Sequence, residues 1–319
     1  MGKRQLPDVP FQAKLVIAFF LIYFIWGSTY LAIRYAIETI PPFLMAGVRF
    51  TTAGTLLYTF MRLTGAANPS LQQWLNLWVV GTFLFLGGNG LVVWAEQYIT
   101  SGLAALLVST LPLWLIMLDW LWAGGPPPAV KGLAGISLGI IGTVVLIDPV
   151  KITATDIYIP GALVVIFGSM LWAAGSIYSK KFTQPDSIFM SAACQMFGGG
   201  LSLLLVSLVL GEWFAFQPVG ISLVSFAAFS YLVVFGSIVA FSAYMYLLKH
   251  VRPAAATSYA YVNPAVAVLL GILFAGEQIG AEECLAMAVI IGAVVLIGIP
   301  QWRRAPQPPV MEAKLSGTR

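Results

Sequence analysis

The sequence predicts an all-α membrane protein in which ten transmembrane helices form two inverted five-helix repeats around a central cavity. Three observations lead to this fold class: the number of long apolar runs, the one-sided distribution of Lys and Arg, and a similarity between the two halves of the chain. Of the 319 residues, 60% are hydrophobic and only 9% are charged. Soluble domains carry roughly 25% charged residues, so this composition predicts a chain whose solvent is lipid.

Ten apolar runs approach the length that a helix needs to cross a bilayer, about 20 residues. Short connectors with Pro, Gly and charged residues separate the runs, and none of the connectors has room for a soluble domain. We therefore expect a cytoplasmic N-terminus (1–14), a first repeat (15–147), an extracytoplasmic connector (148–158), a second repeat (159–300) and a disordered cytoplasmic tail (301–319). The runs are 15–37, 43–62, 74–97, 102–123, 130–147, 159–181, 188–210, 223–248, 254–275 and 281–300.

Lys and Arg fall almost entirely on one side of these spans. An even number of spans places both termini on the same side, and the positive-inside rule assigns that side to the cytoplasm. Only Arg34 and Lys151 fall near the other face, and Arg49 falls within the membrane. The sequence thus predicts a multi-pass protein of a bacterial-type inner membrane with both termini in the cytoplasm. The cytoplasmic cations are Lys3, Arg4, Lys14, Arg62, Lys131, Lys180, Lys181, Lys249, Arg252, Arg303, Arg304, Lys314 and Arg319.

The two halves of the chain share several features in the same order. Trp26 and Trp172 are each followed eight residues later by a cation, and spans four and nine each hold one proline. The string IIGTVVLI at 140–147 returns as IIGAVVLI at 290–297. Five spans are an odd number, so the second half runs through the membrane inverted relative to the first. Inverted repeats are typical of secondary transporters, with the substrate site near mid-depth between the halves.

At this point the sequence resembles a known family. The strings IWGSTYLAIR (25–34), PPFLMAGVRF (41–50) and SYAYVNPAVAVLLG (258–271) are similar to the EamA family of the drug/metabolite transporter superfamily, and within it to the YedA-type exporters. The resemblance covers essentially all ten spans. It implies a carrier with a central cavity, with the fourth, fifth, ninth and tenth helices as scaffold, and export of amino acids, related metabolites or drugs. One departure is Gly125, since the family often has a Glu there to match Glu277.

Arg49 is the strongest single clue to a site, because a charge inside the bilayer is costly. It lies about two turns into span two, and either a substrate carboxylate or Glu96 at the outer end of span three is a suitable partner. Pairing with Arg49 would hold Glu96 ionised, which disfavours proton transfer although Glu96 is the best candidate for coupling. We therefore expect a facilitator or a weakly coupled carrier. Sodium coupling stays open.

Aromatic and amide side chains near mid-depth are predicted to line the cavity with Arg49, although aromatic residues also serve as packing or lipid-facing groups. Glycines and prolines inside spans predict helix breaks that permit gating, with a simple packing kink as the alternative. The predicted breaks are Gly87, Gly88, Gly90, Pro112 and Pro264. The predicted cavity residues are Trp26, Tyr30, Arg49, Asn89, Trp172, Tyr178, Tyr259 and Asn263.

The remaining features narrow the class of protein. Two Cys and one His predict neither a metal site nor a cofactor, and Lys and Arg do not cluster with aromatics as in nucleic-acid binding proteins. The expected partners are a small-molecule substrate and membrane lipid. A glycine stripe from 132 to 142 predicts close helix packing in a monomer or a homodimer. An importer is the main alternative to an exporter, and an intramembrane enzyme is a remote one, because His250 lies at a helix end.

Overall fold

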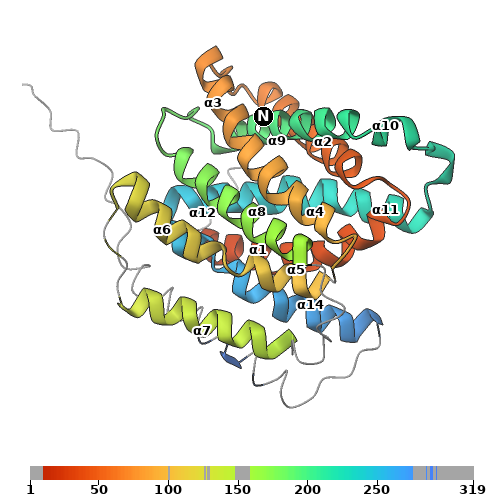
Figure 1. Ribbon diagram of the computed structural model, residues 1–319. Helices are drawn as coiled ribbons and strands as arrows, with labels where there is room; N and C mark the ends of the chain where they lie inside the picture. Colours follow the sequence, from red (N-terminus) through yellow and green to blue (C-terminus); the bar gives the residue numbers. More distant parts are fainter. Residues whose placement is uncertain are drawn as a thin grey trace, which may run out of the picture.

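The computed structural model describes residues 10–99, 101–125, 127, 130–147 and 159–275, together with 285, 288, 289 and 292. The predicted connector 148–158, nearly all of the tenth predicted span and the tail from 301 lie outside these residues. Every regular element in the described part of the chain is a helix (Figure 1).

The first half holds α1 (Phe11–Ile37), α2 (Pro42–Leu63), α3 (Leu71–Gly81), the π-helix η1 (Thr82–Gly90), α4 (Leu91–Ala95), α5 (Ser101–Val108), α6 (Leu111–Ala123) and α7 (Val130–Ile147). The second half holds α8 (Ile159–Tyr178), α9 (Ile188–Val209), α10 (Glu212–Ala215), the 3₁₀-helix η2 (Pro218–Gly220), α11 (Leu223–Tyr231), the π-helix η3 (Leu232–Val239), α12 (Ala240–His250), α13 (Pro253–Ala256) and α14 (Tyr259–Ala275).

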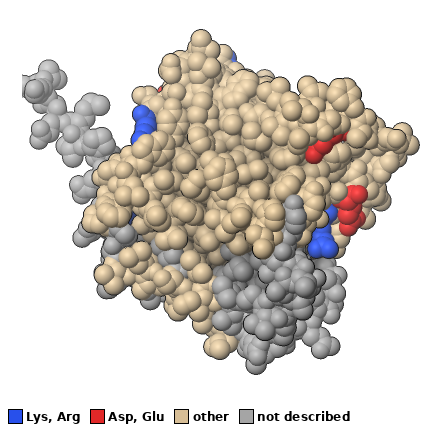
Figure 2. Space-filling view, viewed as in Figure 1, with Lys and Arg blue, Asp and Glu red and all other residues tan. Residues whose placement is uncertain are grey.

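Within the described residues, five helical segments are long and apolar enough to cross a membrane. Charged atoms are sparse on the face shown in Figure 2, as expected for a surface in contact with lipid. Every predicted span up to residue 275 contains a helix or a run of helices, so the all-helical class is confirmed. The count of ten and the inverted relation of the halves stay predictions. The five segments are Phe11–Ile37, Leu71–Ala95, Ile159–Tyr178, Ile188–Val209 and Leu223–His250.

Helices of one half pack mainly against helices of the other. The most extensive packing between two helices joins α2 to α9. In addition, α1 packs against α14 and α12, and α8 packs against η1. Small residues allow the approach of α2 and α9: a Cβ on Gly54 would lie 2.5 Å from the Phe197 nitrogen, and one on Gly200 would lie 2.5 Å from the Thr51 nitrogen. The core therefore sits between the halves, with α7 outermost on the side of α14 (Figure 1).

The predicted helix breaks take different forms. The fourth span is interrupted between α5 and α6, and Pro112 is the second residue of α6, where a missing N–H costs nothing. Pro264 lies inside α14, and the ninth span is interrupted before it, between α13 and α14. Gly87, Gly88 and Gly90 lie in η1, and a second π-helix, η3, stands at the corresponding place in span eight. Such widened turns frequently mark functional sites.

Candidate functional site

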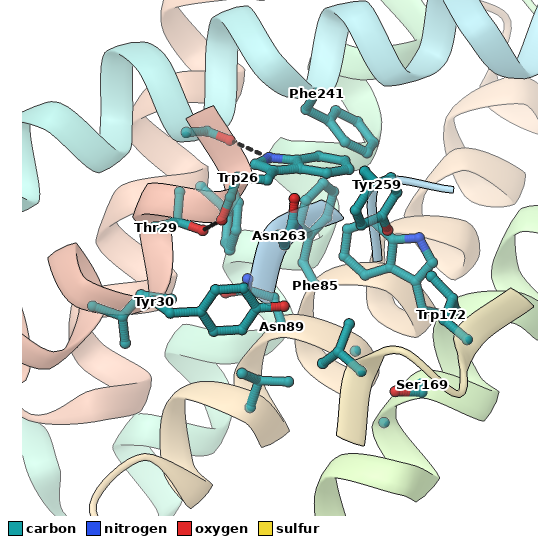
Figure 3. A pocket seen from close by; sticks show the side chains of 18 of the residues that line it. Trp26, Thr29, Tyr30, Phe85, Asn89, Ser169, Trp172, Phe241, Tyr259 and Asn263 are labelled. Atoms are coloured by element: carbon teal, nitrogen blue, oxygen red, sulfur yellow. Dashed lines mark hydrogen bonds between the residues drawn. The ribbon is translucent and has the colours of Figure 1, made fainter. Parts of the chain in front are cut away.

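A cavity of about 70 Å³ lies where α1, α2, η1, α8, η3 and α14 meet (Figure 3). A buried water needs roughly 10–15 Å³ by this measure, so the space suits a few waters or a small solute. It lies between the two halves of the chain, as the sequence predicts for a substrate site. The lining residues are Trp26, Thr29, Tyr30, Ile33, Arg49, Phe50, Phe85, Gly88, Asn89, Val92, Val108, Leu111, Gly168, Ser169, Trp172, Gly236, Phe241, Tyr259 and Asn263.

Arg49 is the one charged residue among those that line the cavity, and its side chain is only 2% exposed. Its Nε donates to the Ser237 hydroxyl at 2.8 Å. That hydroxyl in turn donates to the carbonyl of Leu232 at 3.0 Å, so the π-helix η3 holds the arginine in place. The guanidinium carbon lies 4.5 Å from the centre of the Phe50 ring. Nη1 has no hydrogen-bond partner in the described structure, which leaves a buried donor for a ligand.

An aromatic layer closes one side of the cavity and consists of Trp26, Trp172, Phe241, Tyr244 and Tyr259. The two tryptophan rings that the repeat relates meet edge to face, with centres 5.8 Å apart, and Trp26 also contacts Tyr259 at 4.6 Å. Figure 3 shows Trp26, Tyr259 and Trp172 on this side, with Tyr30 and Asn89 across the cavity. Edge-to-face pairs are favourable because the ring edge is positive and the face negative.

Hydrogen bonds fix the layer from both halves of the chain. The Trp26 indole nitrogen donates to the carbonyl of Gly236 at 2.9 Å. The Trp172 indole nitrogen donates to the Tyr244 hydroxyl at 3.1 Å, which also lies 2.9 Å from the Ser176 hydroxyl. With both indole N–H groups satisfied inside the protein, the tryptophans offer ring surface rather than donors to a solute.

Two amides supply neutral polar groups. With the amide nitrogen of Asn263 turned toward α1, it donates to the backbone carbonyls of Tyr259 at 3.0 Å and Tyr23 at 3.3 Å. Asn263 thereby satisfies backbone oxygen close to Pro264. The Asn89 side-chain oxygen is buried without a hydrogen-bond partner in the described structure, so it is an acceptor available to a solute.

At two positions in the cavity wall there is no room for a side chain larger than that of glycine. A Cβ on Gly88 would lie 2.6 Å from the Trp172 ring, and one on Gly236 would lie 2.9 Å from Arg49 Nη2. Each glycine therefore keeps room for the side chain that crosses over from a different helix.

Most of the predicted site residues come together, but not all. Trp26, Tyr30, Arg49, Asn89, Trp172, Tyr259 and Asn263 line the cavity with Gly88. Tyr178 does not, because its ring stacks on Trp122, with centres 6.4 Å apart and planes 9° apart. Gly87 and Gly90 pack against Leu171 and Leu203. Neither Pro112 nor Pro264 is among the lining residues.

Sequence reasoning missed several lining residues. Thr29, Phe85, Ser169, Phe241 and Gly236 line the cavity as well. A signal for Gly236 and its neighbour Ser237 was present, because they occupy the part of span eight that corresponds to the glycine run of span three. The small or apolar side chains of the others carry no signal by residue type alone.

The direct pair between Arg49 and Glu96, one of two partners considered from sequence, is not formed. Arg49 bonds to Ser237 instead, and neither carboxylate oxygen of Glu96 has a hydrogen-bond partner in the described structure. Glu96 follows the last residue of α4 and lines a separate, more open pocket beside the cavity.

Comparisons with known proteins identify related sequences and a related fold. Residues 13–148 and 159–299 each match the EamA-like transporter family. The uncharacterized inner membrane transporter YedA of Escherichia coli K12 is 42% identical over 286 residues, which are 89% of this chain and 90% of that protein. A probable amino-acid metabolite efflux pump of the same strain is 28% identical over 171 residues, 50% of this chain and 52% of its own. A crystal structure with 21% identity covers 91% of this chain and 99% of its own, with a TM-score of 0.72, which is a likeness of fold.

Proposed function

Because this chain belongs to the EamA-like transporter family, we propose that it exports amino acids or related small metabolites across a bacterial-type inner membrane. The similarity to an inner membrane transporter supports the location. The similarity to a probable amino-acid metabolite efflux pump supports the substrate class and the direction. The carrier is a secondary transporter with ten spans in two inverted repeats and with both termini in the cytoplasm.

Transport proceeds by alternating access, in which the two halves rock about a substrate held between them. The aromatic layer separates the cavity from the end of α1 that bears the N-terminus. The π-helices η1 and η3 both contribute residues to the cavity wall and supply the widened turns at which a helix bends. Opening toward the cytoplasm then requires the contacts between Trp26, Trp172 and Tyr244 to separate.

The observation that carries the proposal is the buried, unpartnered Nη1 of Arg49 at the cavity. An uncompensated buried cation is costly, and a substrate carboxylate offsets that cost by accepting its hydrogen bond. Phe85 and Trp172 offer apolar surface to the rest of the solute, and the Asn89 oxygen accepts one further donor. This set of groups fits a small carboxylate-bearing metabolite better than an organic cation.

Counterflow in proteoliposomes tests the proposal. The purified protein is offered labelled amino acids, nucleobases and cationic drugs, each with the same unlabelled solute inside. We expect exchange of one or more amino acids and none of the cationic drugs. Exchange restricted to nucleobases or cations contradicts the substrate class, and no exchange of any solute contradicts the carrier function.

A further inference from the structure

A second pocket, here called the vestibule, lies beside the central cavity. It encloses about 450 Å³ and is lined by Arg34, Ile37, Glu38, Glu96, Gln97, Tyr98 and Ile99. These residues come from the end of α1 and from the segment that follows α4. By the same measure the vestibule is far larger than the central cavity of about 70 Å³.

The vestibule continues the cavity along two helices. On α1, Ile33 lines the cavity and Ile37 lines the vestibule. On the chain that leaves η1, Val92 lines the cavity and Glu96 the vestibule. Both steps are four residues, which is about 6 Å along a helix and returns to nearly the same face. The vestibule is therefore the next position on a path that leads from the aromatic layer past the cavity toward the far end of α1.

Glu96 is the unusual group in this pocket. Its side chain is 7% exposed, and neither carboxylate oxygen has a hydrogen-bond partner in the described structure. A buried carboxylate without a partner is costly. The cations whose charges act on it are Arg34 in the vestibule and Arg49 in the cavity. Neither forms a direct hydrogen bond to it, so both of its buried acceptor oxygens lack a donor in the described structure.

The geometry points to the vestibule as a second binding site, in which Glu96 binds the ammonium group of a zwitterionic solute and Arg34 binds its carboxylate. This inference rests on the proposed function and adds a second position to the substrate path. An ammonium group brings three donors to a carboxylate that has none, and such charge-assisted hydrogen bonds are the strong ones. A zwitterion adds no net charge, so it passes the vestibule without adding to the charge that Arg34 and Glu96 already balance.

The site makes Glu96 a specificity-determining residue. A solute with a carboxylate but no ammonium satisfies Arg49 in the cavity and leaves Glu96 unpartnered in the vestibule. A hydrogen bond to a charged group contributes about 1.5–3 kcal/mol. Loss of the ammonium group should therefore weaken binding in the vestibule about tenfold or more.

The test is protection of a vestibule cysteine by ligand. Ile37→Cys, in a background with Cys194 and Cys284 replaced by Ala, is labelled with a neutral thiol reagent in nanodiscs. The probes are an equimolar mixture of the proteinogenic L-amino acids other than cysteine, whose thiol would consume the reagent, and the matched mixture of their N-acetyl derivatives, which lack the ammonium group. We expect the amino acids to slow labelling at concentrations about tenfold lower than the N-acetyl derivatives.

Substitutions then locate the effect. Glu96→Gln should abolish the difference between the two mixtures. The control Asp186→Asn should preserve it, because Asp186 is exposed in the connector between α8 and α9 and lines neither the vestibule nor the cavity. Equal protection by both mixtures with Glu96 intact overturns the inference without any variant at that position. A preference for amino acids that survives Glu96→Gln also overturns it.

This result and the counterflow result are distinguishable. Protection measures binding at Ile37→Cys and needs no transport. Protection without counterflow upholds the vestibule site and contradicts the carrier. Counterflow of amino acids with no protection by either mixture upholds the carrier and contradicts the vestibule site.

Discussion

Arg49 is held by one hydrogen bond and one aromatic ring, and that partial satisfaction leaves Nη1 for a ligand. We predict that Arg49→Lys lowers amino-acid counterflow about 10- to 100-fold. Lysine cannot bond Ser237 and a carboxylate with the same fixed geometry, and a hydrogen bond to a charged group is worth about 1.5–3 kcal/mol. The control is Arg62→Lys, at the exposed end of the same helix. Wild-type rates for both Arg49→Lys and Arg49→Ala would show that the guanidinium does not hold substrate.

The paired tryptophans give the second prediction at this scale. Trp26→Ala and Trp172→Ala should each reduce counterflow at least tenfold, because each removes ring surface from the cavity and a partner from the aromatic layer. Size-exclusion profiles check that the variants remain folded. Trp213→Ala, at a side chain that is 54% exposed, serves as the control. Undiminished transport by both cavity variants would assign the tryptophans to packing alone.

Individual site residues were predictable where a physical cost or the repeat singled them out. Arg49 was marked by the cost of a charge in the bilayer, and Trp26 with Trp172 by their equivalent positions. The sequence placed Tyr178 at the cavity because residue type alone does not tell which face of a helix a side chain occupies. Tyr178 follows Trp172 by six residues, about 240° around the helix, and so faces Trp122 instead of the cavity. Ser169 precedes Trp172 by three residues, close to the same face, and does line the cavity.

At the scale of elements, the two π-helices are the feature that most directly shapes the cavity. Each contributes a widened turn. In η3, the Gly236 carbonyl accepts a hydrogen bond from the Trp26 indole nitrogen, and the Ser237 hydroxyl accepts one from Arg49 Nε. The sequence indicated the first, because three glycines surround Asn89. It did not predict the second as a helix break, since LVVFGSIV carries one glycine and its only other signal is its correspondence to the glycine run of span three.

Close contact between η1 and α8 leads to a prediction about Gly88. Gly88→Ala should reduce transport several-fold, because the new Cβ would lie 2.6 Å from the Trp172 ring and push that ring into the cavity. The control is Gly132→Ala on α7, where a Cβ meets nothing within 4 Å. Counterflow rates and thermal unfolding together separate a blocked cavity from a destabilised helix. Equal rates for Gly88→Ala and the parent would show that Trp172 moves freely.

At the scale of the whole molecule, the five spans found in the described residues could be predicted because lipid imposes a simple length rule on apolar helices. The central position of the cavity followed from the similarity between halves. The vestibule could not be predicted from the sequence, because it depends on the position of the Glu96 carboxylate in the segment that follows α4. Pairing of Glu96 with Arg49 was one of the two arrangements that the sequence left open, yet Arg49 is held by Ser237 from the other half of the chain. Such cross-half contacts are invisible to reasoning about one span at a time.

Topology gives a prediction for the entire chain. In a background free of Cys194 and Cys284, Ala154→Cys and Ala215→Cys should react with an impermeant thiol reagent from outside, whereas Gln184→Cys and Pro308→Cys should not. The one-sided Lys and Arg motivate this orientation. The structure places 184 and 215 beyond opposite ends of α9, one of the candidate spans. Labelling at 184 and 308 alone would reverse the orientation.

The energy source for transport also belongs to the molecule as a whole. A proton-coupled carrier needs a titratable group that faces two aqueous phases in turn. None of the described residues that line the cavity carries a carboxylate or an imidazole. Glu96 is the carboxylate just beyond the cavity, and it lines the vestibule on the side away from the aromatic layer. We have proposed that Glu96 selects solutes from this position, and a group on one side of the cavity does not carry protons across it.

We accordingly predict facilitated exchange without strong coupling. In proteoliposomes preloaded with substrate at equal concentration on both sides, an imposed proton or sodium gradient should produce no net accumulation, while a substrate gradient alone should drive flux. Uphill accumulation under a proton gradient would contradict this prediction, and its loss in Glu96→Gln would make Glu96 the coupling residue. Accumulation under a sodium gradient would instead direct attention to the backbone oxygens of α14, where Pro264 leaves one carbonyl without its usual N–H donor.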